Sequence, residues 1–185
     1  MLFSLCFLVA LWEILLVAES LYYLRSSARS AGNFFIYLYY MNISIINGPN
    51  LNLLGKRETT VYGSQSFDEF LAALKVKYPN VHIHYFQSNV EGELVSELQR
   101  VGFEADGIVF NPGGYTHTSV AIGDAIAAIT SPVVEVHISN VHAREDFRKI
   151  SHVSAKAAGS IFGLGLKGYE LAIDYLISLE PTNAL

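Results

Sequence analysis

Two ionisable residues in an otherwise apolar segment indicate proton-transfer chemistry. Glu135 and His137 lie in the β-branched run 132–138, which is typical of a buried strand. Residues two apart in a strand point to the same face, so the two side chains share one environment. Burying both is costly unless they pair with each other or with a ligand, and a histidine paired in this way suits acid–base catalysis near neutral pH. The alternative interpretation is a Glu–His pair that serves the core alone.

Basic residues follow directly after this run. His142, Arg144 and Arg148 all lie within the segment 139–148. Positive charge just past a buried strand favours an anionic or polyhydroxylated ligand at that end of a sheet. The alternative is the solvated start of a helix.

A second pair of interest lies in the polar, glycine-containing segment 53–63. Arg57 precedes Tyr62 by five residues, and Gly63 follows the tyrosine. A tyrosine ordinarily has a pKa near 10, so acting as a base at the working pH requires a decrease of roughly 3 units, about 4 kcal/mol. An adjacent arginine in a water-poor site favours the phenolate, and a mobile loop would create this base only when closed over a substrate. The alternative is that Tyr62 is a packing aromatic.

Short apolar runs alternate with helical patterns from residue 42 onward. This alternation predicts an α/β fold with a five-stranded parallel sheet and helices on both faces. Ser66 with Glu69 three residues later forms a capping box, and the alternating run with His82 and His84 on one face predicts an exposed edge strand. The predicted strands cover 42–46, 81–86, 107–110, 132–138 and 159–163, and the predicted helices begin at Ser66 or cover 91–101, 119–129 and 169–179.

Polar loops follow the first, third and fourth predicted strands, at 47–50, 111–118 and 139–148. In open parallel sheets, ligands bind outside the carboxyl ends of the strands. We therefore expect these three loops to converge on one crevice, which strengthens the interpretation of a functional site.

Other chemistries lack their sequence patterns. No GxxxxGK[ST] or GxGxxG motif follows a strand and opens a helix, and the glycine-spaced segment 163–168 favours a tight helix entry instead. A zinc site built from His117, His137 and His142 matches no closed-site spacing, so no metal is expected. A serine nucleophile would need an elbow motif, which this sequence lacks.

The composition separates an apolar leader from a mildly acidic domain. The charges of residues 1–40 cancel, so the net charge of −5 belongs to residues 41–185 and gives no electrostatic footprint for nucleic acid. The only cysteine, Cys6, lies in the leader, so a disulfide or a thiolate nucleophile is excluded for the domain. The charged residues of the leader are Glu13, Glu19, Arg25 and Arg29.

Three interpretations of residues 1–40 stay open. The preferred one places this segment outside the working protein, with Met41 as the natural start of a single catalytic domain in the cytoplasm. A membrane anchor is disfavoured because Glu13 lies within the apolar segment, where an acid is costly. A targeting peptide is disfavoured because no basic residue precedes Arg25.

Three long segments occur in order along the chain, namely INGPNLNLLGKRE at 46–58, FNPGGYTHTSVAI at 110–122 and EVHISNVHAREDFR at 135–148. They resemble the signature segments of type II 3-dehydroquinate dehydratase, and the ending GYELAIDYL is similar too. The resemblance covers residues 41–185 and none of 1–40. It implies a flavodoxin-like fold, a homododecamer built of trimers, and a cofactor-free anti elimination of water from 3-dehydroquinate, in the shikimate route or in quinate catabolism.

The same resemblance implies roles for the candidate residues. Tyr62 takes the proton next to the ketone, Arg57 keeps this tyrosine ionised, and Asn50 helps hold the enolate oxygen. His137 protonates the departing hydroxyl, and Glu135 orients His137. The implied substrate-binding positions are Asn111, His117, Ile138, Ser139 and Arg148, with Asp124 reaching the ligand of a neighbouring subunit and Arg144 near the site. A non-catalytic module that keeps only the scaffold would have lost one of these residues, and none is lost; a related lyase acting on another cyclic polyol acid would show the same set.

Overall fold

The computed structural model describes residues 40–55 and 65–179. The chain divides into two units between Tyr39 and Tyr40, and the described residues all belong to the second unit. The predicted pair Arg57 and Tyr62 and the segment 1–39 lie outside the described residues. Within residues 40–55 and 65–179, no helix has the length and apolar character needed to cross a membrane.

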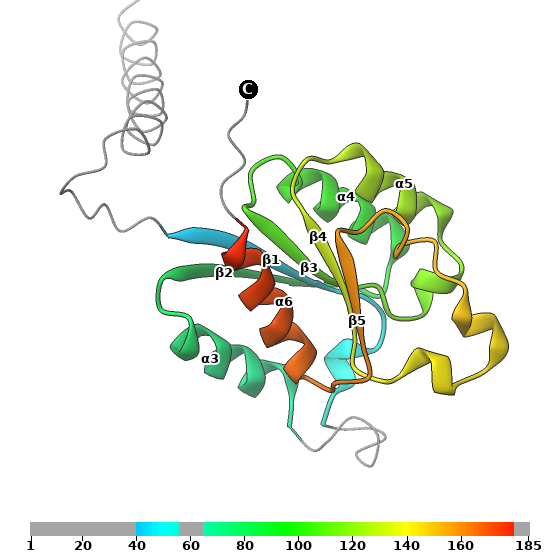
Figure 1. The fold of residues 1–185 in the computed structure, drawn as a ribbon, viewed down its shortest axis with the longest axis horizontal. Helices are drawn as coiled ribbons and strands as arrows, with labels where there is room; N and C mark the ends of the chain where they lie inside the picture. The colour runs from blue at the N-terminus through cyan, green and yellow to red at the C-terminus, as the bar shows by residue number, and fades with distance from the viewer. Residues whose placement is uncertain (1–39, 56–64, 180–185) are drawn as a thin grey trace, which may run out of the picture. The chain divides into compact units, whose positions relative to one another are not determined.

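Five parallel strands form one sheet in the order β2-β1-β3-β4-β5 (Figure 1). The strand order reverses around β1, because β2 lies on one side of it and all later strands lie on the other. The predicted α/β fold with a five-stranded parallel sheet is confirmed. The strands are β1 Met41–Asn47, β2 Val81–Gln87, β3 Gly107–Asn111, β4 Val133–His137 and β5 Gly159–Phe162.

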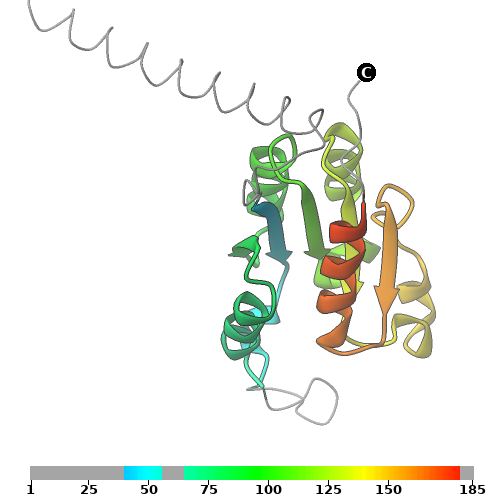
Figure 2. The ribbon, with the colours of Figure 1, turned by 60° about the vertical axis from the view of Figure 1, so that its left-hand side comes forward.

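Helices cover both faces of the sheet, as Figures 1 and 2 show. Helices α3 and α6 pack on one face, and α4 and α5 pack on the other. In the described connection between β4 and β5, two short 3-10 helices take the place of an α-helix. The elements are α3 Phe67–Lys77, α4 Glu91–Val101, α5 Val120–Ala128, α6 Lys167–Ser178, and the 3-10 helices η1 Leu51–Leu53, η2 Gly113–His117, η3 Val141–Ala143 and η4 Asp146–Lys149.

The two faces carry separate apolar cores. Strands β3 and β4 are buried along their whole length, as expected for central strands of a sheet covered on both sides. Val134 and Val136 join the core beneath α3 and α6, whereas Val133 joins the core beneath α4 and α5. Because side chains alternate along a strand, Glu135 and His137 belong to the α4 and α5 face.

Local signals placed several element ends correctly. The capping box at α3 is confirmed, because the Ser66 hydroxyl accepts a hydrogen bond from Glu69 N at 3.2 Å and Ser66 N donates to Glu69 Oε2 at 3.0 Å. Helix α6 begins at Lys167, two residues before the predicted start, so Gly168 lies in its first turn. A Cβ at Gly168 would lie 3.1 Å from Val136, so glycine allows this turn to pack closely against β4.

The edge position predicted for the strand with His82 and His84 is confirmed, because β2 is the outermost strand beside β1. His82 is exposed, whereas His84 Nε2 lies 2.8 Å from Glu97 Oε1 on α4. Arg100 also binds Glu97, at 2.7 Å. The partner of His84 therefore comes from the helix that follows the strand.

The loop after β1 meets the loop after β3 at Gly48. Gly48 N donates a hydrogen bond to the carbonyl oxygen of Asn111 at 2.7 Å. A Cβ at Gly48 would lie 2.5 Å from the carbonyl oxygen of Pro112, a backbone atom that cannot turn aside as a side chain would. Glycine therefore allows the close approach of these two loops.

Substituting Gly48→Ala should lower the free energy of unfolding by about 1–3 kcal/mol, because it overpacks this loop contact. The matched control is Gly92→Ala in α4, where an added Cβ meets nothing within 4 Å. The control should raise the free energy of unfolding by up to about 1 kcal/mol, since alanine favours a helix over glycine. Urea unfolding of both variants at one protein concentration measures the difference, and equal effects would contradict the predicted clash.

Candidate active site

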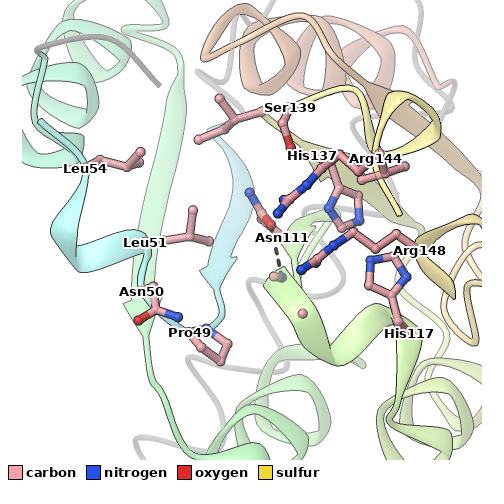
Figure 3. A pocket seen from close by; sticks show the side chains of 14 residues that line it. Pro49, Asn50, Leu51, Leu54, Asn111, His117, His137, Ser139, Arg144 and Arg148 are labelled. Atoms are coloured by element: carbon pink, nitrogen blue, oxygen red, sulfur yellow. Dashed lines mark hydrogen bonds between the residues drawn. The ribbon is translucent and has the colours of Figure 1, made fainter. Parts of the chain in front are cut away.

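The three polar loops enclose a crevice of about 230 Å³ at the carboxyl ends of β1, β3 and β4 (Figure 3). The predicted convergence of these loops is confirmed. The loop after β1 contributes Pro49, Asn50, Leu51 and Leu54; the loop after β3 contributes Asn111, Gly113, Gly114 and His117; and β4 with its following loop contributes His137, Ile138, Ser139, Val141, Arg144 and Arg148.

The predicted pair of Glu135 and His137 forms, with His137 Nε2 at 2.8 Å from Glu135 Oε1. Glu135 is fully buried, and His137 is 6% exposed at the crevice. Four hydroxyl groups also surround the Glu135 carboxylate. They belong to Thr116 at 2.5 Å, Ser160 at 3.0 Å, Ser151 at 3.4 Å and Ser154.

These contacts keep Glu135 ionised. Burial by itself would raise the pKa of Glu135, but the hydrogen bond and charge of His137 and the hydroxyls of Ser154 and Thr116 outweigh it and lower the pKa to about 2. A carboxylate accepts hydrogen bonds only, so His137 Nε2 is the donor. Nδ1 is therefore the ring nitrogen of His137 that remains for a ligand.

A second histidine lies beside the first, with ring centroids of His117 and His137 6.4 Å apart. His117 Nδ1 lies 2.7 Å from the carbonyl oxygen of Ile150, and a carbonyl only accepts, so Nδ1 carries the hydrogen. Burial lowers the pKa of His117, against the smaller opposing effect of that hydrogen bond. His117 is thus a neutral ring whose Nε2 is a hydrogen-bond acceptor.

Two arginines supply positive charge to the crevice. Arg144 and Arg148 both line it, and both lie near the exposed carboxylate of Glu145, Arg148 at 2.8 Å and Arg144 at 3.6 Å. The Arg148 guanidinium also lies over the Phe147 ring, 4.9 Å from its centroid. Two guanidinium groups facing one carboxylate leave excess positive charge, which suits an anionic ligand.

The loop after β1 turns sharply at Asn50, which lines the crevice in the left-handed conformation with φ 68°. Asparagine tolerates this conformation better than most residues because its short polar side chain can bond locally. Asn50 N donates to Asn89 Oδ1 at 2.9 Å, and this bond holds the turn.

A family model described as Dehydroquinase class II matches residues 41–177 of this chain. The chain belongs to this family. The resemblance identified from the three sequence segments, and the flavodoxin-like fold it implied, are confirmed.

The match covers almost the full length of individual relatives in the dehydroquinase family. A 3-dehydroquinate dehydratase from Fusobacterium nucleatum is 54% identical over 143 residues, covering 74% of this chain and 97% of the relative. A catabolic 3-dehydroquinase from Aspergillus clavatus is 49% identical over 137 residues, covering 73% of this chain and 91% of the relative. The crystal structure of type II dehydroquinase from Butyrivibrio crossotus matches with a TM-score of 0.72 and 46% identity, covering 75% of this chain and 99% of that one.

The predicted site residues of this dehydroquinase-family chain differ in where they lie. Most of them line the crevice, whereas Glu135 lies buried behind His137. Asp124 is exposed on α5 and does not line the crevice of its own chain. Arg57 and Tyr62 lie outside the described residues. His142 also stays out of the crevice and meets the Phe162 ring edge-on, with centroids 5.4 Å apart.

The zinc alternative gains no support in the described part of the chain, where no group of three His, Cys, Asp or Glu side chains gathers in a metal-binding arrangement. His117 and His137 are instead engaged by Ile150 and Glu135, respectively.

Sequence reasoning missed the four hydroxyl groups around Glu135 and the buried tyrosine behind Asn111. Thr116 lies within one of the recognised segments, but Ser151 and Ser154 lie in the connection to β5 and Ser160 lies in β5 itself, where no pattern marks them. Tyr169 donates to Asn47 Oδ1 at 2.8 Å and accepts from Asn111 Nδ2 at 2.9 Å. Its only sequence signal was its place in the family-like ending at 168–176.

Substituting Glu135→Gln should remove a pH-dependent part of the stability. The folded pKa of Glu135 is depressed from 4.5 to about 2, so its stabilisation is fully present above pH 4.5 and is lost as the pH falls toward 2. At pH 7 the variant should lose about 3 kcal/mol of unfolding free energy, and this deficit should shrink between pH 4.5 and pH 2. Urea unfolding over this pH range measures it, with the exposed Glu104→Gln as control. A deficit independent of pH would show that the ionised form of Glu135 is not the stabilising one.

Proposed function

We propose that this chain is a 3-dehydroquinate dehydratase that removes water by anti elimination through an enolate, giving 3-dehydroshikimate. The observation that carries the proposal is His137, which lines the crevice while a buried, ionised Glu135 holds its Nε2. The match to the dehydroquinase class II family over residues 41–177 supports the substrate. The described chemistry needs no cofactor, since positioned donors stabilise an enolate.

His137 is the acid in this proposal. Nε2–H donates to Glu135, so the ring can protonate a leaving hydroxyl only when it is doubly protonated, with its second hydrogen on Nδ1. The Glu135 carboxylate keeps its hydrogen bond from Nε2–H in the imidazolium as well, so the ring stays in place while the proton moves. The enolate then re-forms the carbonyl, and its electron pair makes the new C=C bond as the C–O bond breaks. The pair of the C–O bond stays on oxygen, Nδ1 supplies the proton, and water departs.

Tyr62 is the base, assigned from its position in the sequence. Its phenolate takes the proton next to the ketone, and the C–H electron pair moves into the enolate. Arg57 keeps the phenolate ionised and stabilises the developing charge. Asn50, at the rim of the crevice, donates to the enolate oxygen through its amide.

The remaining crevice residues bind the substrate. The neutral His117 offers Nε2 as an acceptor for a substrate hydroxyl, and Asn111 binds a second hydroxyl. Arg148 and the backbone amides of Ile138 and Ser139 are assigned to the carboxylate and its neighbouring hydroxyl. Arg144 adds positive charge at the same end of the crevice.

We further propose that residues 41–185 form the working domain and that 1–40 take no part in the reaction. The family match beginning at Met41 supports this division.

The assembly is proposed to be a homododecamer of trimers in which Asp124 enters the crevice of a neighbour. The exposed position of Asp124 on α5, one turn after the 58%-exposed Val120 on the same face, supports a contact there.

Substituting Tyr62→Phe should abolish nearly all turnover while 3-dehydroquinate still binds, and His137→Ala should reduce turnover severely. Absorbance of the conjugated enone product measures turnover, for the full chain and for residues 41–185. The matched controls are Tyr175→Phe and His84→Ala, since Tyr175 is exposed and His84 pairs with a glutamate outside the crevice. Near-normal turnover in Tyr62→Phe or His137→Ala would remove that residue from its assigned role.

Mixed oligomers test the contribution of Asp124. Asp124→Ala and Tyr62→Phe chains should each be nearly inactive alone. After joint refolding in equal amounts, sites that pair an intact Tyr62 with an intact neighbouring Asp124 should restore about a quarter of wild-type turnover. Sedimentation checks that the assembly forms, and mixtures without any gain would contradict a shared site.

A further inference from the structure

A buried chain of hydrogen bonds runs behind the crevice on the α3 and α6 face of the sheet. Gly113 N donates to Asn111 Oδ1 at 3.1 Å, a bond dashed in Figure 3. Asn111 Nδ2 donates to the Tyr169 hydroxyl at 2.9 Å, and this hydroxyl donates to Asn47 Oδ1 at 2.8 Å. Tyr169 and Asn47 are fully buried, and Asn111 is 2% exposed.

A backbone N–H fixes which atoms donate and which accept along this series of hydrogen bonds. Gly113 N–H is a donor only, so it requires the oxygen of the Asn111 amide on its side. The nitrogen of Asn111 then faces Tyr169, whose oxygen must accept and whose hydrogen must go to Asn47. The Asn47 amide therefore points its oxygen at Tyr169, and its buried Nδ2 has no hydrogen-bond partner among the described residues.

The hydroxyl of Tyr169 stays protonated, since burial raises the pKa of Tyr169 above its usual range. The ring is held independently of the hydroxyl. Its edge-to-face neighbours are Phe67 and Phe70 of α3, with centroids 5.2 and 5.9 Å away. Removing only the oxygen therefore leaves the ring packing in place.

We propose that Tyr169 is a positioning residue that acts through Asn111. With one Nδ2 hydrogen held by Tyr169 and one Oδ1 lone pair held by Gly113, the amide has one hydrogen and one lone pair left for the crevice. A hydroxyl group both donates and accepts, so this arrangement recognises a hydroxyl of the substrate. The inference rests on the proposed function, in which Asn111 binds a substrate hydroxyl.

The test is Tyr169→Phe in the full chain, assayed with 3-dehydroquinate. The KM should rise about tenfold with kcat within about twofold, because the lost interaction orients a binding group and not a reacting one. In an Asn111→Ala background, Tyr169→Phe should cause no further rise in KM, because the residue it orients is absent.

The matched control is Tyr78→Phe. Tyr78 is also nearly buried, and its hydroxyl donates to Asp174 Oδ1 of α6 at 2.7 Å, away from the crevice. If the Tyr169 hydroxyl has only a structural role, both variants should show the same kinetics. If it positions Asn111, KM should rise for Tyr169→Phe alone. An unchanged KM in folded Tyr169→Phe, or effects of Tyr169→Phe and Asn111→Ala that simply add, would overturn the inference.

A second variant keeps the test decisive if Tyr169→Phe does not fold. In Asn47→Ala, the hydroxyl hydrogen of Tyr169 loses its acceptor. Once free to rotate, the hydroxyl no longer holds its oxygen toward Asn111 Nδ2, so Asn111 is oriented less well and KM should again rise. A wild-type KM in folded Asn47→Ala, or failure of both variants to fold, overturns the positioning role. An inactive wild-type chain would instead contradict the proposed function itself.

Discussion

The buried charge of Glu135 sets the requirements for the structure around it. An ionised carboxylate with no exposed surface is tolerated only where hydrogen-bond donors surround it. The donors come from β4 itself, from η2, from the connection after η4 and from β5. Those segments must meet at one point before the charge can be buried, so a single side chain ties together the loop after β3 and the last two strands.

The parallel sheet makes such a meeting possible. All five strands run in the same direction, so the loops after β1, β3 and β4 leave from the same edge. Covering both faces with helices makes the strand interiors largely apolar, and Glu135 in the middle of β4 is a charged exception. The crevice and the apolar core are two consequences of one arrangement.

Two polar networks approach the crevice from opposite faces of the sheet. Asn47 and Asn111 continue the alternation of the strand residues beneath α3 and α6, where Tyr169 packs. Glu135 and His137 continue the alternation on the α4 and α5 face. One network thus orients an amide for binding, and the other orients an imidazole for proton transfer.

The sequence by itself determined the features that depend on neighbours along the chain. Alternating apolar runs, the capping box at Ser66 and the two-residue spacing of Glu135 and His137 are local, and the three long segments identified the family. Only the tertiary structure decided which partners complete each polar group. Tyr169 and Asn47 are 122 residues apart, and Thr116 lies 19 residues from Glu135. No periodicity links such positions, because the contact exists only once helices and strands have packed; the exposed place of Asp124 on α5 likewise follows from packing.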